Sequence, residues 1–175
     1  QFAASFDAKE LGEIAGRYHD VGKYSARFQE YLRGGRSSGG DHSTGGAQLL
    51  YQKGQPLLCL AAWAIAGHHG GLPDFGGAFD GEGSPTFCGR MRKPLSDFSA
   101  WQEDEHMSIA LSHVPACLKS SDIYQLQFFT RMLFSCLVDA DFLDTEAFYQ
   151  SCLPEVEQTA GTKSRHGFDT LEELK

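Results

Sequence analysis

The chain of 175 residues is 41% hydrophobic and 22% charged, a balance that excludes global disorder and suffices for one packed domain. Its net charge of −8 argues against a general nucleic-acid coat. That charge is uneven, because residues 139–175 hold nine acids and three bases, so a local basic surface stays possible on residues 1–138. The longest fully apolar run has ten residues, whereas a membrane span needs roughly 20.

The five cysteines are widely spaced and form no CxxC pair. This pattern argues against a disulfide framework and against a thiolate zinc site. It favours a reducing compartment, and we expect a cytoplasmic protein without a membrane partner. Residue 1 is Gln rather than Met, so we expect the chain to be part of a longer protein.

Helical spacing dominates residues 1–40. An amphipathic helix is predicted by four apolar residues at i, i+3, i+4 and i+7: Leu11, Ile14, Ala15 and Tyr18. Ser25 is the expected N-cap of a short helix that carries Phe28 and Leu32. Residues 33–40 are rich in glycine and serine, which predicts a flexible loop.

Two further helices are predicted before a long irregular stretch. The first covers about residues 42–52. The second covers residues 57–69, which are apolar on every side, as a buried central helix would be, and it stops at Gly70 and Gly71. Seven glycines lie within residues 70–89, and we expect the irregular stretch to reach to about position 104.

The last third of the chain again has a helical pattern. A helix is predicted to resume near Glu105 and to break around Pro115. The strongest helical pattern covers residues 123–144, and Thr145 is the expected cap of one more short helix. The sequence therefore predicts an all-α domain over residues 1–153 and a polar, acidic linker or tail over residues 154–175.

Four of the seven histidines have sequence neighbours that are typical of a binding site. His19 precedes an aspartate directly, His42 opens a predicted helix, and His68 and His69 are adjacent at the end of the apolar helix. Two neighbouring imidazoles are costly to bury without partners, although a helix C-terminus also favours a protonated histidine, so a structural role stays open. The isolated residues His106, His113 and His166 are expected to have ordinary surface or structural roles.

Imidazole and carboxylate groups together form a ligand set for divalent first-row metals. Six side chains are candidate ligands: His19, Asp20, His42, His68, His69 and one late aspartate. A carboxylate can bridge two ions, so a binuclear site accounts for six ligands economically. Two such ions suit the hydrolysis of phosphate esters.

The late aspartate is either Asp139 or Asp141, which point in different directions from one helix. Asp141 follows Phe134, Leu137 and Val138 at helical spacing and so lies on an apolar stripe. A carboxylate on a buried stripe needs a compensating charge, which a metal supplies. Asp141 is therefore the predicted ligand.

These segments, taken in order, resemble the HD superfamily of metal-dependent phosphohydrolases. The closer likeness is to the HD nuclease domain of the CRISPR-associated nuclease-helicase of type I systems, and it covers most of residues 8–147. The segments that carry it are His19-Asp20-Val21-Gly22-Lys23 followed by SARFQEYL, Asp41-His42-Ser43, Gly67-His68-His69-Gly70-Gly71-Leu72, and LVDADFLDTE from Leu137 to Glu146. The last segment resembles the subgroup with a compact Cascade complex.

The resemblance implies a compact helical bundle with two divalent transition-metal ions (Mn, Fe, Co or Ni). It implies that Asp20 bridges the ions as a catalytic residue, that His19 and Asp141 bind one ion, and that His42, His68 and His69 bind the other. Lys23 would support the site or meet a phosphate, although a helix-end cation near the dipole is an equal alternative. The implied partners are single-stranded DNA, a helicase domain of the same protein and the Cascade effector complex.

The chain departs from this family in two respects. The family has an earlier metal-binding histidine, whereas no histidine precedes His19 here, and we interpret the domain as N-terminally truncated. The chain also has no GxxxxGK[ST] phosphate loop, so the helicase domain is expected to lie outside it.

A basic cluster lies on the glycine-rich stretch and is the predicted nucleic-acid contact: Arg90, Arg92 and Lys93. Phe75, Phe79 and Phe87 on the same stretch are available for base stacking, or they anchor the loop to the core. The overall prediction is a metal-dependent nuclease for single-stranded DNA in CRISPR interference. The alternatives are a phosphohydrolase for small nucleotides and a non-catalytic, metal-containing docking module.

Overall fold

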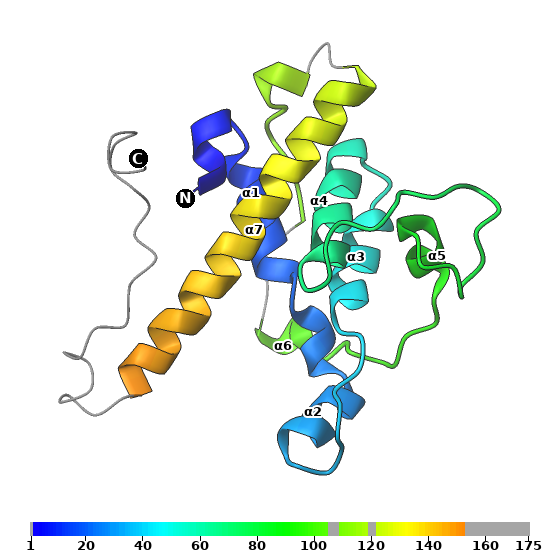
Figure 1. The fold of residues 1–175 in the computed structure, drawn as a ribbon, viewed down its shortest axis with the longest axis vertical. Coiled ribbons are helices and arrows are strands. Elements are labelled where there is room, and N and C mark those ends of the chain that lie inside the picture. The colour runs from blue at the N-terminus through cyan, green and yellow to red at the C-terminus, as the bar shows by residue number, and fades with distance from the viewer. Residues whose placement is uncertain (1, 105–108, 119–121, 153–175) are drawn as a thin grey trace, which may run out of the picture. The chain divides into compact units, whose positions relative to one another are not determined.

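The computed structural model describes residues 2–104, 109–118 and 122–152. Within these ranges the protein has helices and no strand (Figure 1). This confirms the predicted all-α fold class. The elements in chain order are the 3-10 helix η1 (Phe2–Phe6), α1 (Lys9–Tyr18), the 3-10 helix η2 (Val21–Tyr24), α2 (Ala26–Leu32), α3 (Ser43–Tyr51), α4 (Pro56–Gly67), α5 (Phe87–Arg92), α6 (Trp101–Asp104), the 3-10 helix η3 (Ala116–Leu118) and α7 (Ile123–Cys152).

The chain divides into two compact units, of which the first ends at Asp141 and the second begins at Phe142 within α7. All candidate site residues belong to the first unit. The predicted linker over residues 154–175 lies outside the described residues. Within the described ranges, no helix combines the length and the apolar character that a membrane crossing requires.

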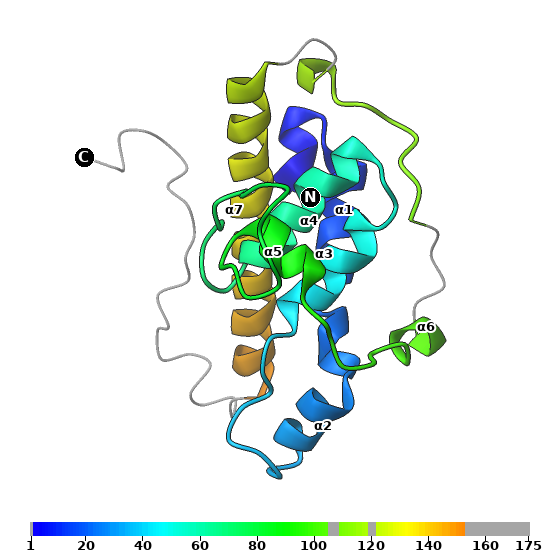
Figure 2. The same cartoon turned by 90° about the vertical axis from the view of Figure 1, so that its right-hand side faces the viewer.

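Helix α4 lies at the centre of the first unit, and α1, α3 and α5 contact it (Figure 2). It is apolar all round, and Pro56 at its first turn suits a helix start, where no backbone N–H is needed. Leu58 and Ile65 are fully buried in the core, which α1 joins through Leu11 and Ile14. The predictions of a buried central helix and of an amphipathic α1 are confirmed.

Two glycines allow α3 to approach the first part of the chain closely. A Cβ on Gly46 would lie 1.8 Å from the carbonyl oxygen of Tyr18, and a Cβ on Gly22 would lie 2.0 Å from that of His42. Only glycine fits such contacts. They hold the start of α3 against the segment that follows α1, and so bring two of the motif segments together.

Three details of the helix prediction are wrong. The stretch expected to be irregular contains α5 and α6, and Thr86 begins α5 by accepting a hydrogen bond from the Gly89 N–H. The predicted start of a helix near Glu105 lies outside the described residues, and residues 109–114 are not helical. Helix α7 continues through Thr145 to Cys152, because neither glycine nor proline interrupts it before Pro154. The predicted cap at Ser25 is confirmed, since its hydroxyl accepts from the Phe28 N–H.

Candidate metal centre

The candidate ligands lie at the ends of helices, where the chain changes direction. His19 is the C-cap of α1, and Asp20 is the N-cap of η2. His42 directly precedes α3, and His68 directly follows α4. Side chains at such ends are free to turn toward a common point while the helices stay packed.

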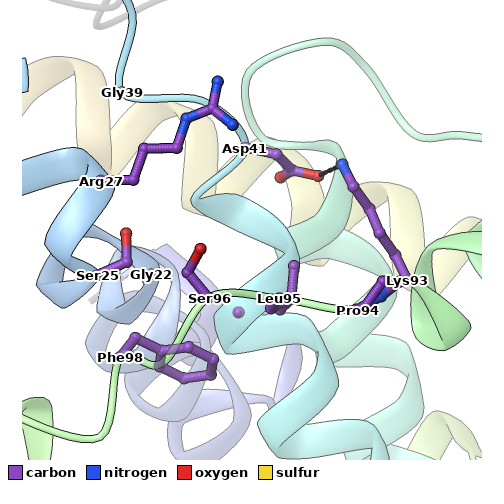
Figure 3. A pocket seen from close by; sticks show the side chains of 11 residues that line it. Gly22, Ser25, Arg27, Gly39, Asp41, Lys93, Pro94, Leu95, Ser96 and Phe98 are labelled. Atoms are coloured by element: carbon purple, nitrogen blue, oxygen red, sulfur yellow. Dashed lines mark hydrogen bonds and ion pairs between the residues drawn. The ribbon is translucent and has the colours of Figure 1, made fainter. Parts of the chain in front are cut away.

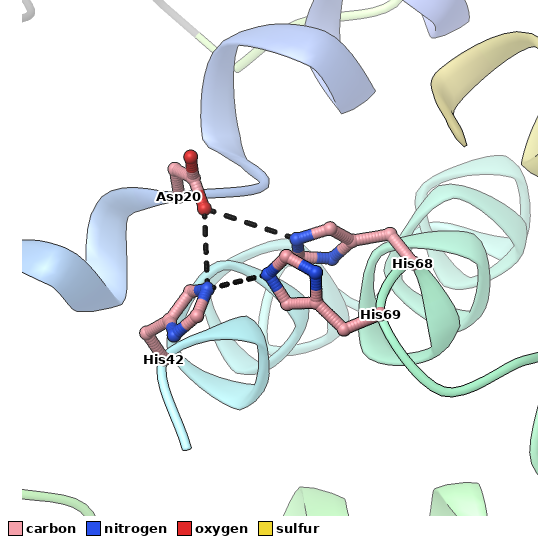
Figure 4. A group of neighbouring side chains, drawn as sticks. All are labelled: Asp20, His42, His68 and His69. Carbon is pink, nitrogen blue, oxygen red and sulfur yellow. Dashed lines mark hydrogen bonds and ion pairs between the residues drawn. The ribbon is translucent and has the colours of Figure 1, made fainter. Parts of the chain in front are cut away.

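Four of them form one group: Asp20, His42, His68 and His69 (Figure 4). Asp20 Oδ1 lies 3.5 Å from Nε2 of His42 and 3.8 Å from Nε2 of His68. The Nε2 atoms of His42 and His69 are 2.7 Å apart. The four ligand atoms lie within 4.8 Å of one another, close enough for one ion to contact all of them.

A second group contains His19, His68 and Asp141. His19 Nε2 lies 3.5 Å from Asp141 Oδ1 and 3.2 Å from Asp20 Oδ2. Asp20 therefore directs one carboxylate oxygen toward His19 and the other toward His42 and His68. His68 belongs to both groups, although the resemblance implies it for only one ion.

The imidazoles of His19 and His68 are fixed in one tautomer by the backbone. Nδ1 of His68 lies 2.7 Å from the Ile65 carbonyl oxygen, and Nδ1 of His19 lies 2.7 Å from that of Gly16. Because a carbonyl oxygen only accepts, each Nδ1 carries a proton, and Nε2 is the nitrogen that presents a lone pair when the ring is neutral. Such a backbone contact typically orients a metal-binding histidine.

Four buried atoms of the candidate ligands have no hydrogen-bond partner among the described residues: His19 Nε2, Asp20 Oδ1, His42 Nδ1 and His68 Nε2. Burial without a partner is costly for such groups. Three of them, His19 Nε2, Asp20 Oδ1 and His68 Nε2, are of the kind that bind divalent metals and lie in the two ligand groups, whereas His42 turns its Nε2, not its Nδ1, toward Asp20. The residues present therefore fit a metal ion, whose binding would satisfy them.

Electrostatics favour the metal-binding protonation states of Asp20, His42 and His68, whereas the carboxylate beside His19 favours its protonated form while no metal is bound. Burial lowers the pKa of His68 to about 4 and also lowers the pKa of His42, so both are neutral near pH 7. Burial opposes the charge on Asp20, but His19 and Lys23 outweigh it and hold the pKa of Asp20 well below its usual range. Burial likewise opposes protonation of His19, yet contacts with Asp20 raise the pKa of His19 overall.

Lys23 lies beside this centre in η2. Its Nζ donates to Asp20 Oδ2 at 2.5 Å, and its side chain is 39% exposed. Lys23 thus contacts the carboxylate predicted to bridge the ions. Between the two late aspartates, α7 presents Asp141 to His19 and leaves Asp139 exposed, as the helical stripe predicts.

The predicted nucleic-acid residues engage in contacts within the protein. Arg90 binds groups at the ends of α3 and α4, Arg92 donates to the carbonyls of Ala78 and Asp80, and Lys93 Nζ pairs with Asp41 at 2.8 Å. A role for them with nucleic acid stays a prediction.

The three phenylalanines of the glycine-rich stretch differ in their surroundings. Phe87 is fully buried in the core, and the ring of Phe75 packs edge-on against Trp63 at 5.1 Å. Phe79 is fully exposed. Two of them therefore anchor the stretch, as the alternative interpretation predicts, and Phe79 is the one available for base stacking.

A pocket of about 100 Å³ lies beside the segments that carry Asp20 and His42 (Figure 3). Gly22 and Asp41 form part of its wall, and Ser25, Ser96 and Arg27 line it. Sequence reasoning missed this pocket, because its lining comes from three separate segments.

Asp41 is a second residue whose role the sequence did not reveal. Its Oδ1 accepts from the Thr44 N–H at 3.1 Å, and its Oδ2 accepts from the Thr44 hydroxyl at 2.7 Å. Burial opposes its charge, but hydrogen bonds from Lys93 and Thr44 and the charge of Arg90 hold the pKa of Asp41 well below its usual range. Asp41 therefore fixes the start of α3 and does not face the metal ligands' common point.

Comparisons of the chain with protein-family models, with curated proteins and with solved structures gave no match. The likeness to the HD superfamily accordingly stays a prediction from the motifs, and the geometry of the site carries the functional argument.

Proposed function

We propose that this chain is a metal-dependent phosphodiesterase that holds two divalent transition-metal ions and cleaves single-stranded DNA. The observation that carries the proposal is the pair of overlapping ligand groups, which share His68 and have the two oxygens of Asp20 directed to different sides. When bound, such ions supply an activated water and offset the charge that develops on the phosphate oxygens.

The chain's own residues would hold this centre ready for substrate. The Gly16 and Ile65 carbonyls orient His19 and His68, so little reorganisation is needed when a metal binds. Lys23 holds the Asp20 carboxylate by a charged hydrogen bond and balances part of its charge. Because Lys23 is also partly exposed, it is placed to meet a phosphate at the same site.

The adjoining pocket supports an extended anionic substrate. Arg27 and Ser96 line this pocket, and neither forms an ion pair or hydrogen bond with the other lining residues drawn in Figure 3. The charge of Asp41 in the pocket wall is offset by Arg90 and Lys93. A second phosphate of a strand would find a cation and hydroxyl donors there.

The resemblance supports the identity of the substrate and of the partners. A nuclease of this kind would receive single-stranded DNA from a helicase domain of the same protein, recruited by a Cascade complex in the cytoplasm. No hydroxyl or thiol nucleophile in the chain is needed for hydrolysis by activated water.

A nuclease assay with metal addition tests the proposal and its two alternatives. Circular single-stranded DNA should be cleaved with Mn²⁺ or Co²⁺ without ATP, duplex DNA should resist, and EDTA should stop the reaction. Cleavage of free nucleotides with intact circular DNA would instead indicate a small-nucleotide phosphohydrolase. Bound metal without any hydrolysis would indicate a docking module.

A further inference from the structure

Arg90 binds the start of α3 on both sides of the candidate ligand His42. Its Nη2 donates to Asp41 Oδ1 at 3.1 Å and to the Ser43 hydroxyl at 2.8 Å. The Thr44 hydroxyl accepts from Nε at 3.0 Å and from Nη2 at 2.6 Å. Three residues that flank His42 are therefore held by one guanidinium.

The same side chain reaches the end of α4. Nη1 of Arg90 donates to the carbonyl oxygen of Ala66, two residues before His68. The backbone leaves this carbonyl unpaired, since the turn at His68 bonds to Ile65 and the turns at Gly70 and Gly71 bond to Gly67. Carbonyls at a helix C-terminus carry partial negative charge, which a guanidinium suits.

Arg90 is itself held rigidly, although α5 is short. Phe87, in the first turn of α5, is fully buried, and the Thr86 hydroxyl caps the helix. The side-chain amide of Gln48 in α3 donates to the carbonyl of Arg90 at 3.0 Å and to that of Lys93 at 2.7 Å. Helix α5 is thus fastened to α3 by its backbone as well as by the guanidinium.

These contacts argue against a direct nucleic-acid role for Arg90. Each of its three guanidinium nitrogens already donates to a partner within the protein, and its side chain is only 21% exposed. A phosphate contact would have to displace several of these bonds. Arginine suits this place because its rigid guanidinium donates in several directions at once, and the acceptors lie at the ends of two different helices.

We propose that Arg90 is a positioning residue for the metal centre, which sets the spacing between His42 and the His68–His69 pair by joining the start of α3 to the end of α4. The inference rests on the proposed function, because it presupposes that these histidines bind metal. It gives Arg90 a role in orienting the metal ligands, which Arg92 on the same helix does not share.

Cobalt titration of the full chain, followed by visible absorption, tests the inference. Arg90→Gln is expected to lower the affinity for one of the two Co²⁺ ions by about 10- to 100-fold, which is typical when a residue that orients a metal ligand is removed. The absorption bands of that ion should also change. The other ion should lose less affinity, because its group shares only His68 with the first and also contains His19 and Asp141, which Arg90 does not contact. Arg92→Gln is the matched control, because it removes the same charge from α5 and loses only bonds to loop carbonyls.

Arg90→Lys separates geometry from charge. Lysine restores the charge without the fork, so affinity should recover only in part and the altered bands should persist. A purely structural role would lower the denaturation midpoint of the metal-free variant and leave the bands of the loaded form unchanged. If Arg90→Gln does not fold, Arg90→Lys alone carries the test through these bands.

The outcomes distinguish this inference from the proposed function. A wild-type chain that binds no cobalt would overturn both. A wild-type chain that binds two ions, with an Arg90→Gln variant that matches it in affinity and absorption, would overturn the positioning role alone. Equal weakening in the Arg92→Gln control would do the same.

Discussion

His19 Nε2 lies 3.5 Å from Oδ1 of Asp141, and this contact joins the end of α1 to α7 at the candidate metal centre. We predict that Asp141→Asn weakens metal binding and DNA cleavage by tenfold or more, because the amide is a poorer ligand than the carboxylate. Asp139→Asn makes the same chemical change on the exposed side of α7 and should behave as the wild type. Metal affinity and cleavage rate are to be measured for both variants in parallel. Equal effects would show that Asp141 is not a ligand.

Arg27 provides a test of the pocket next to the segments that carry Asp20 and His42. Arg27→Gln should raise KM for single-stranded DNA by about threefold to tenfold at low salt, because one charged contact to a phosphate is lost. The number of metals bound should not change. The slope of log affinity against log salt should fall by about 0.7, the contribution of one phosphate in a single strand.

Arg33→Gln is the control for Arg27→Gln. Arg33 caps the other end of α2 and does not line the pocket, so its loss should leave both KM and the salt slope near the wild-type values. Similar changes in the two variants would mean that only net charge matters, and would contradict a phosphate site in the pocket.

Gly46 tests the close approach of α3 to the end of α1. Gly46→Ala should destabilise the metal-free protein by roughly 2 kcal/mol or more, because its Cβ would overlap the carbonyl oxygen of Tyr18 and force α3 to move. Gly16→Ala is the contrasting variant: it lies within α1 with open space around it, and should stabilise the protein by about 0.5–1 kcal/mol. Denaturant unfolding in EDTA measures both, and an unchanged midpoint for Gly46→Ala would refute the contact.

The sequence carried enough information for the helices that form the core. The amphipathic stripe of α1 and the all-apolar α4 have their expected places, because burial of apolar surface determines both. Helices α5 and α6 were missed, because Thr86 and the glycines around it are typical of loops and α6 is only four residues long. Helix α5 forms because Phe87 enters the core and Gln48 fastens its backbone, and both are contacts between distant segments.

The candidate ligands could likewise be named from the sequence, because His19-Asp20 and His68-His69 are unusual dipeptides. The structure brings all six together and turns Asp141 toward His19, but it places His68 in both ligand groups and not in one alone. The positions of Arg90 and Lys93 near the centre followed from the chain order, but their partners did not. Both pair with Asp41, which neutralises part of their charge. A local sequence pattern cannot predict this pairing, because the partners lie about fifty positions apart.

The most direct test of the binuclear centre is a count of metal ions per chain in the wild type and in Asp20→Ala. The full chain is loaded anaerobically with Mn²⁺ or Co²⁺, freed of excess metal and assayed for bound ions together with cleavage of circular single-stranded DNA. We predict two ions and cleavage for the wild type, and fewer ions with no cleavage for Asp20→Ala, whose helical content should persist. A wild-type chain that holds no metal, or an Asp20→Ala variant that cleaves DNA at the wild-type rate, would contradict the account.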